Sequence, residues 1–259
     1  MEHDRYENPL CTRYASERMQ QILSPDYKFT TWQRLWLSLA ENEMKLGLPV
    51  TQEQVDELTM ENSRLMQNQY RLEELEELMA HSRAWGEHGP KARGIIHLGA
   101  TSCYVDDNGD LIAFRDAMEQ VRGLLLGVIG ALADFALAQK DTPVLAYTHY
   151  QAAQPTTLGK RACMWLQDFM FDLERLDFEL ERLEFYGCKG ATGTGASFLA
   201  LFCGDAEKAD ELERRIAAGA GCCEAMEAVA VELACSYGKV RNCYYQTFKS
   251  NHDEIGNSD

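Results

Sequence analysis

Proline and long apolar runs are scarce in this sequence. It holds six prolines among 259 residues, which favours helices over turn-rich folds. No run approaches the roughly eighteen apolar residues that a membrane-spanning helix needs, so no membrane span is expected. Basic residues are also few, because 25 Lys and Arg stand against 41 Asp and Glu, for a net charge of −16. This balance argues against nucleic acid and anionic membranes as partners.

Cysteine motifs typical of metal sites or disulfide frameworks are lacking. The nine cysteines are odd in number and contain no C-x-x-C pair, which indicates a reducing compartment. Cys222 and Cys223 are adjacent, but no histidine stands at metal-ligand spacing from them, so we expect no metal and no other cofactor. The charged segment Met1–Tyr6 lacks the apolar region of a secretory signal, and we expect a cytoplasmic protein.

Two long segments carry an unbroken seven-residue repeat of apolar side chains, the pattern of helices in a bundle. The first segment repeats as follows: Leu111, Phe114, Met118, Val121, Leu125, Val128, Leu132 and Phe135. The second repeats in the same way: Ala162, Leu166, Phe169, Leu173, Leu176, Leu180 and Leu183. Gly123, Gly127 and Gly130 predict the close approach of a neighbouring helix to the first segment. Since no convincing alternating strand appears, the sequence predicts an all-α fold.

Shorter helices are predicted ahead of these two. Thr30 or Thr31 can cap a helix that Gly47-Leu48-Pro49 ends. Thr51 and Gln54 have the spacing of a capping box, which would open the next helix.

The predicted organisation is a small N-terminal helical domain followed by an incomplete long-helix bundle. The N-terminal domain spans residues 1–101, and the partial bundle spans 102–238. Residues 239–259 show no apolar period, so we expect a loose tail there.

A polar connection, residues 146–160, separates the two long helices. It contains His149, two glutamines, three threonines and Lys160. Two interpretations are open. The connection can be an ordinary solvated one with a structural histidine, or it can line a cavity where helix ends converge. In the second case His149 could act as a general acid or base near neutral pH.

A second polar stretch, residues 187–197, contains four glycines. The exposed N–H groups of such a loop can cradle an anion, although a plain connecting loop has the same composition. It is not a P-loop, because no G-K-[ST] motif closes it and no strand is expected before it.

Five segments together resemble adenylosuccinate lyases, a branch of the fumarase/aspartase superfamily. They are Arg13-Tyr14-Ala15-Ser16, residues 94–105, Thr148-His149-Tyr150-Gln151, residues 156–161 and residues 189–194. The Thr-Ser-Cys-Tyr run at 101–104 and the Lys-Gly-x-Thr-Gly-Thr run at 189–194 are the most specific. The resemblance extends from about residue 6 to about residue 215.

The resemblance implies a fold, a reaction and a set of site residues. The fold would be all-α, in a homotetramer whose active sites are each built by three subunits. The reaction would be β-elimination of fumarate from adenylosuccinate, and from the succinyl-imidazole-carboxamide ribotide, in purine nucleotide biosynthesis. The substrate would thus be a small purine nucleotide. His149 matches the family's general acid. Residues at substrate-binding positions are Arg13, Tyr14, Thr101, Ser102, Thr148, Gln151, Lys189 and Thr192.

Three departures from the family pattern matter for activity. Leu75, Glu76 and Glu77 stand where the family has Arg-His-Asp, and a carboxylate there would repel an anionic substrate. Gly195 stands where the family has a substrate-binding glutamine. The Ser-Ser-x-Met-Pro loop that carries the family's catalytic base does not occur in the 259 residues.

These observations give a first hypothesis and two alternatives. The first is a truncated, divergent adenylosuccinate lyase-like chain with little activity by itself. The second is a non-catalytic module that assembles with a full-length relative. The third is a fragment that does not fold stably.

Overall fold

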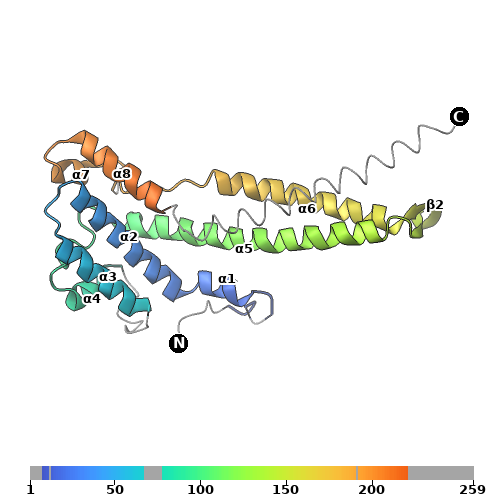
Figure 1. Cartoon of the computed structure of the whole chain (residues 1–259), viewed down its shortest axis with the longest axis horizontal. Coiled ribbons are helices and arrows are strands. Elements are labelled where there is room, and N and C mark those ends of the chain that lie inside the picture. The colour runs from blue at the N-terminus through green and yellow to red at the C-terminus, as the bar shows by residue number, and fades with distance from the viewer. Residues whose placement is uncertain (1–7, 12, 67–77, 191, 221–259) are drawn as a thin grey trace. The chain divides into compact units, whose positions relative to one another are not determined.

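The structure is a computed structural model that describes residues 8–11, 13–66, 78–190 and 192–220 (Figure 1). The described residues form two compact units. Unit 1 comprises the residues up to 117 together with 183–220, and unit 2 comprises 118–182. The tail expected at 239–259 lies outside the described residues. The domain limits at 101 and 238 stay predictions.

Helices dominate both units, as the sequence predicts. In chain order the elements are α1 (Glu17–Ile22), α2 (Pro25–Lys45), α3 (Gln52–Met66), α4 (Leu78–His88), α5 (Ser102–Ala138), β1 (Pro143–Thr148), β2 (Gln151–Thr157), α6 (Leu158–Glu181), α7 (Ala196–Leu201) and α8 (Ala206–Ala220). Helix α5 is continuous from unit 1 into unit 2.

Helix α2 begins earlier than the sequence analysis predicts. Its N-cap is Ser24, whose Oγ accepts a hydrogen bond from the N–H of Tyr27 at 3.2 Å, and Pro25 occupies the first helical position. The predicted start at Thr30 or Thr31 is therefore wrong, because serine followed by proline is a complete start signal in itself. The helix ends at Lys45, just before Gly47 at φ +90°, as expected.

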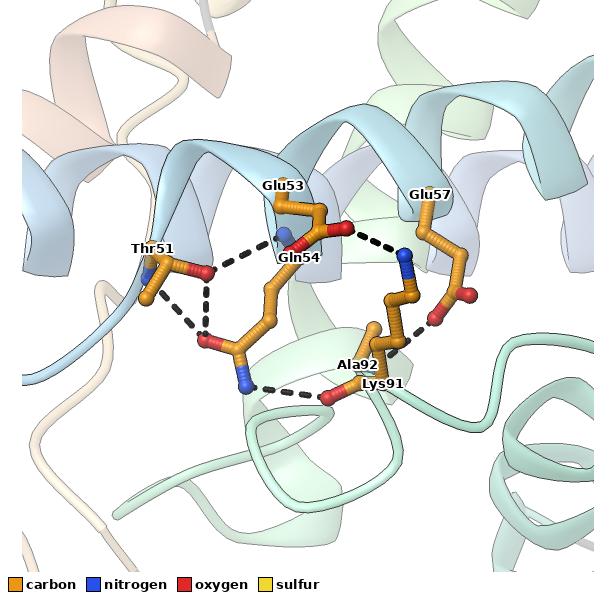
Figure 2. Close-up of polar contacts among 6 residues, drawn as sticks. All are labelled: Thr51, Glu53, Gln54, Glu57, Lys91 and Ala92. Atoms are coloured by element: carbon orange, nitrogen blue, oxygen red, sulfur yellow. Dashed lines mark hydrogen bonds and ion pairs between the residues drawn. The ribbon is translucent and has the colours of Figure 1, made fainter.

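The capping box predicted at Thr51 and Gln54 is confirmed (Figure 2). The N–H of Gln54 donates to Thr51 Oγ1 at 3.3 Å, and the N–H of Thr51 donates to Gln54 Oε1 at 2.9 Å. The same corner ties α3 to the chain after α4. Gln54 Nε2 donates to the carbonyl of Lys91, and Glu57 accepts from the N–H of Ala92 at 2.8 Å. The start of α3 thus fixes the segment that leads toward α5.

Aromatic side chains fill the core of unit 1. Trp36 is 1% exposed and lies 5.7 Å from Trp85 and 6.3 Å from Trp32, measured between ring centroids. His81 is fully buried among these rings, 5.4 Å from Trp36. Glu43, also on α2, is fully buried in the same unit. The core therefore encloses two titratable groups as well as apolar side chains.

In unit 2, α6 returns alongside the second half of α5 (Figure 1). Leu166 and Leu173 of α6 are buried with Leu126, Ile129 and Ala133 of α5. These α6 residues belong to its predicted seven-residue repeat, whose inward orientation is confirmed. Buried methyl and methylene groups at these contacts are the main source of stability for the pair.

The repeat predicted for α5 is only partly turned toward α6. Leu125 and Leu132 of the repeat pack against the buried cluster. Val121, Val128 and Phe135 are between 41% and 45% exposed, and Phe114 is 58% exposed. The apolar surface of α5 is thus wider than α6 covers, and about half of the predicted repeat remains exposed. Among the described residues, no atom lies within 4 Å of a Cβ built on Gly123, Gly127 or Gly130. The predicted close approach of another helix is therefore not made by the described part of this chain.

By length and composition alone, α5 could cross a membrane, because its most apolar window of 18 residues has a mean hydropathy of 1.8. Only 22% of that window is buried. Tyr104, Val105 and Ile112 of the same helix are buried in the core of unit 1. The first turns of α5 are thus part of a protein core.

A two-stranded antiparallel hairpin joins α5 to α6, where the sequence analysis expects no strand. Strands β1 and β2 pair from Pro143 with Thr157 to Thr148 with Gln151, and the register shifts between Leu145 and Tyr147. Alternation is weak because most of the hairpin's side chains are exposed on both faces. A strand without a buried face has no period-2 pattern to recognise.

Candidate functional site

The segment before α5 brings polar groups to the helix start. His97 and Gly99 have positive φ angles of 63° and 67°, which turn the chain sharply ahead of Thr101. Trp36 Nε1 donates a hydrogen bond to His97 Nδ1 at 2.8 Å. The neutral imidazole therefore carries its proton on Nε2, and burial lowers the pKa of His97. Thr101 is half-buried, and Ser102 is the exposed first residue of α5.

The described residues of the glycine-rich segment, 187–190 and 192–195, form a folded loop with internal hydrogen bonds. Gly187, Gly190, Gly193 and Gly195 all have φ between 64° and 84°, the left-handed region that glycine adopts at little cost. The N–H of Gly195 donates to the carbonyl of Lys189 at 2.8 Å. The hydroxyls of Thr192 and Thr194 lie 3.2 Å apart. The loop therefore has a defined shape.

Thr101 and the glycine loop lie next to each other although about ninety residues separate them in the chain. A Cβ built on Gly190 would lie 3.9 Å from Cγ2 of Thr101 and 3.8 Å from Oγ of Ser197. The structure thus brings together Thr101 and the loop that carries Lys189 and Thr192. Hydroxyl and backbone N–H donors at one place suit the carboxylate or phosphate oxygens of a ligand.

Lys189 is already engaged by a carboxylate. Its Nζ lies 3.0 Å from Glu213 of α8, and this hydrogen bond raises the pKa of the lysine. The pair borders a pocket of about 300 Å³ that Thr194, Phe198 and Asp210 also line. The lysine side chain is half-exposed, so a ligand anion would have to compete with Glu213 for it.

Arg13 and Tyr14 lie in the turn that precedes α1, also in unit 1. The N–H groups of both residues donate to the carbonyl of Leu10, and the side chain of Tyr14 is 74% exposed. Among the described residues, no hydrogen bond links either side chain to Thr101 or to the glycine loop. The structure therefore places this pair at the surface and does not join it to that group.

His149 lies at the tip of the hairpin, in unit 2. Thr148 pairs with Gln151, and the two turn residues between them, His149 and Tyr150, have φ of 52° and 61°. Positive φ at both central positions defines a type I′ turn, which residues other than Gly, Asn and Asp adopt at a cost. Thr148, His149 and Gln151 are exposed, and Tyr150 is fully so. Sparsely populated backbone angles in such a turn are typical of functional segments.

The departures from the family pattern are only partly visible. Leu75, Glu76 and Glu77 lie outside the described residues. Gly195 is the N-cap of α7 with φ +64°, and no described atom lies within 4 Å of a Cβ built there. A glutamine would fit in space at this position, but its backbone would be strained.

Three residues near this group were not assigned a role from the sequence. They are His97, Asn108 and Ser197, which hydrogen bond Trp36, the carbonyl of Gly187 and the carbonyl of Gly99, respectively. His97 lies in a segment that carried the family resemblance, which could have drawn attention to it. The roles of Asn108 and Ser197 depend on partners 79 and 98 residues away, so no local pattern could have indicated them.

Comparison with known proteins identifies the family. A family model described as "Lyase" matches residues 50–230, more than half of the chain. The chain belongs to this lyase family. Adenylosuccinate lyases of Saccharomyces cerevisiae and Schizosaccharomyces pombe are each 43% identical to it, over 221 and 223 residues. The adenylosuccinate lyase of Pyrococcus abyssi is 28% identical over 218 residues. The resemblance noted in the sequence is thus confirmed.

The matched relatives are longer than this chain. The alignments with the two yeast enzymes cover 83% of the chain and 46% of each enzyme, so the chain spans about half their length. Among solved structures, 3-carboxy-cis,cis-muconate lactonizing enzyme from Pseudomonas putida matches with a TM-score of 0.68 and 24% identity, covering 80% of this chain and 49% of that one. Fumarate lyase from Mesorhizobium sp. BNC1 gives the same TM-score and identity over 79% and 48%. These matches confirm the all-α fold of the fumarase/aspartase type.

Proposed function

We propose that this chain is an adenylosuccinate lyase-like protein, whose reaction is β-elimination of fumarate from adenylosuccinate and the succinyl-imidazole-carboxamide ribotide in purine nucleotide biosynthesis. The 43% identity to adenylosuccinate lyases over 83% of the chain carries this proposal. The reaction is expected in the cytoplasm, without a metal or other cofactor.

In the proposed mechanism, a base removes a proton from the carbon next to a carboxylate, and an acid protonates the nitrogen that leaves. His149 would be the acid, since histidine can donate a proton near neutral pH. Its exposed place at a turn tip supports this role, because the side chain can meet a ligand held by another surface. The chain alone is expected to turn over slowly, because the base-bearing Ser-Ser-x-Met-Pro loop is not in its sequence.

The other proposed residues would hold the substrate. Thr101, Ser102, Lys189 and Thr192 would bind it in unit 1, and the contact of Gly190 with Thr101 supports a common ligand for them. Arg13 and Tyr14 would bind the phosphate region of a nucleotide, where an arginine is well suited. Thr148 and Gln151 would flank His149 on the hairpin.

A complementation assay tests the reaction and the role of His149 together. The purified chain is mixed with a variant of the S. cerevisiae relative in which the histidine aligned with His149 is replaced, and fumarate release from adenylosuccinate is followed. We expect the mixture to regain activity, and His149→Gln in this chain to abolish the gain. The chain alone should stay far below about 10 turnovers per second. A mixed oligomer without activity would contradict the proposed role of His149.

A second candidate function is a non-catalytic module that pairs with a full-length relative or with itself. The exposed apolar side chains of unit 2 favour it. On α6, Met164, Trp165, Phe171 and Phe178 are all at least half exposed. A groove of about 470 Å³ lies between α5 and α6, lined by Val128, Leu132, Trp165, Asp168 and Phe169. Co-assembly with an active relative that changes its rate, without restoring activity to the histidine variant, would favour this function over catalysis.

A further inference from the structure

The two polar segments of unit 1 are tied together by a side chain. Ser197, the second residue of α7, donates its hydroxyl to the carbonyl of Gly99 at 2.6 Å. Gly99 lies two residues before Thr101, and Ser197 lies two residues after the glycine loop ends at Gly195. One hydrogen bond therefore joins the segment before α5 to the start of α7, close to Thr101 on one side and to the glycine loop on the other.

Packing around Gly99 leaves little freedom for this contact to shift. Gly99 has φ +67°, and a Cβ built on it would lie 2.6 Å from Leu201 and 2.9 Å from Phe198, both on α7. The segment before α5 is thus in direct contact with α7. The hydroxyl of Ser197 meets the Gly99 carbonyl at a fixed separation because the backbone and α7 are packed together.

A second tie holds the other end of the glycine loop. Asn108 of α5 is 1% exposed, and its Nδ2 donates to the carbonyls of Gly187 at 2.9 Å and Tyr104 at 2.6 Å. Its Oδ1 accepts from the N–H of Tyr186 at 2.9 Å. All of these groups are buried or partly buried, so losing the amide would leave polar backbone groups unpaired. The loop is therefore anchored at one end to α5 and at the other end to the segment that leads into α5.

We propose that Ser197 and Asn108 are positioning residues, which hold the glycine loop at the distance from Thr101 and Ser102 at which both segments bind one ligand. This inference rests on the proposed function, because the ligand is taken to be adenylosuccinate. Neither residue needs to touch the ligand. Each acts by limiting the movement of the glycine-rich segment, which lowers the entropy lost on binding.

Ser197 variants test the proposal, because the residue is exposed and its replacement should not unfold the chain. Ser197→Ala removes the donor to Gly99, and Ser197→Thr retains a hydroxyl at the same place. Thr51→Ala is the matched control, since it removes a hydrogen bond between a side-chain hydroxyl and the backbone elsewhere in unit 1, where Thr51 Oγ1 accepts from the N–H of Gln54 (Figure 2). Adenylosuccinate binding is measured by calorimetry, and amide hydrogen exchange is measured at Gly193 and Gly195.

We expect Ser197→Ala to speed exchange in the glycine loop and to weaken binding, each about fivefold, as for the loss of one hydrogen bond. Ser197→Thr should restore both values, and Thr51→Ala should change neither while lowering the melting temperature to a similar degree. Asn108→Asp, which keeps the acceptor but loses both donated bonds, should speed loop exchange further.

The measurements separate failure of this inference from failure of the proposed function. If wild type binds adenylosuccinate and Ser197→Ala changes neither exchange nor affinity, the positioning role is overturned and the proposed function stands. If wild type does not bind the nucleotide but loop exchange still responds to Ser197→Ala and Ser197→Thr, the result supports the role of Ser197 in holding the loop and contradicts the proposed function. Equal exchange in the loop for all variants would overturn the inference whatever the binding result.

Discussion

Glu43 is a fully buried carboxyl group whose two oxygens have no hydrogen-bond partner among the described residues. Burial raises its pKa from the ordinary value of 4.5 to about 8. Its titratable neighbours are Tyr104 of α5 and Cys188 of the glycine loop, and Glu43 contributes to raising the pKa of both. At neutral pH the group is therefore protonated in the folded chain and ionised in the unfolded chain.

This difference predicts that unit 1 loses stability as pH rises. Below about pH 4.5 Glu43 is protonated in both the folded and the unfolded chain, so it makes the free energy of unfolding independent of pH there. Between about pH 4.5 and pH 8 the free energy of unfolding falls by about 1.4 kcal/mol per pH unit because of this group. Glu43→Gln should remove this term, so the variant should exceed wild type in free energy of unfolding by on the order of 4 kcal/mol at pH 8. Urea unfolding at pH 5, 7 and 8 measures the gap. Parallel curves would show that Glu43 finds a partner in solution.

His81 has the opposite effect on the acid side. Burial lowers its pKa from 6.5 to about 4. The stability that the chain gains from burying the neutral imidazole is therefore full above pH 6.5 and is lost as the pH falls toward 4. His81→Phe keeps an aromatic ring near Trp36 but cannot bind a proton. Between pH 6.5 and 4 the variant should therefore lose on the order of 3 kcal/mol less free energy of unfolding than wild type. With Glu43, this predicts maximal stability between about pH 4.5 and 6.5. Thermal melting across pH 3.5–9 tests both limbs, and a maximum above pH 7 would contradict them.

At the scale of elements, Gly159 is where α6 meets the end of α5. A Cβ built on it would contact the carbonyl oxygen of Ala136 and would lie 2.8 Å from the backbone N and Cα of Lys140. These are backbone atoms, so the clash cannot be relieved by a rotamer change. The N–H of Gly159 also donates to the carbonyl of Gln139 at 2.9 Å. The hairpin's return into α6 thus requires glycine here.

We predict that Gly159→Ala costs about 3 kcal/mol or more, the upper range for strain in a packed core. Gly127→Ala is the control, since it makes the same chemical change in α5 but faces open space among the described residues. By helix propensity it should stabilise the isolated chain by about 1 kcal/mol. Equilibrium unfolding of the two variants gives both values, and equal effects would contradict the packing at Gly159.

At the scale of the whole molecule, many apolar side chains of unit 2 remain exposed to solvent. One face of α5 is covered by α6, while Val121, Leu124, Val128 and Phe135 remain at least 41% exposed. The burial of such side chains is worth roughly 25 cal/mol per Å², and exposed apolar patches commonly mark protein interfaces. We therefore expect this stripe to be buried between copies of the chain or against a full-length relative.

Charge on the stripe should prevent association. Val121→Asp and Val128→Asp each put a carboxylate where an interface would exclude water, so we expect at least a tenfold weaker association. Gln21→Glu is the control, because it adds the same charge on an exposed side chain of α1. Sedimentation velocity over a concentration series measures the change. An unaltered distribution of species in both stripe variants would contradict the assignment of this face.

The sequence by itself determined the helices, the capping box and the family. Seven-residue spacing, the Thr51 and Gln54 pair and the motifs around Thr101 and Lys189 are local patterns, and local patterns follow from the geometry of a single helix or loop. The start of α2 at Ser24 is ambiguous in the sequence, because serine followed by proline is typical both of a turn and of a helix start. The hairpin also has no clear local signal, because its strands are mostly exposed and alternate only weakly.

Only the tertiary structure decided which faces and loops meet. Leu126 and Ile129 of α5 are buried against α6, whereas Val121 and Val128 of the predicted repeat stay exposed. Both sets are apolar, so their spacing in the sequence cannot show which of them is buried. The tertiary structure also brings Gly190 beside Thr101. Such contacts depend on how separate helices pack, which is set by shape and burial over the whole unit.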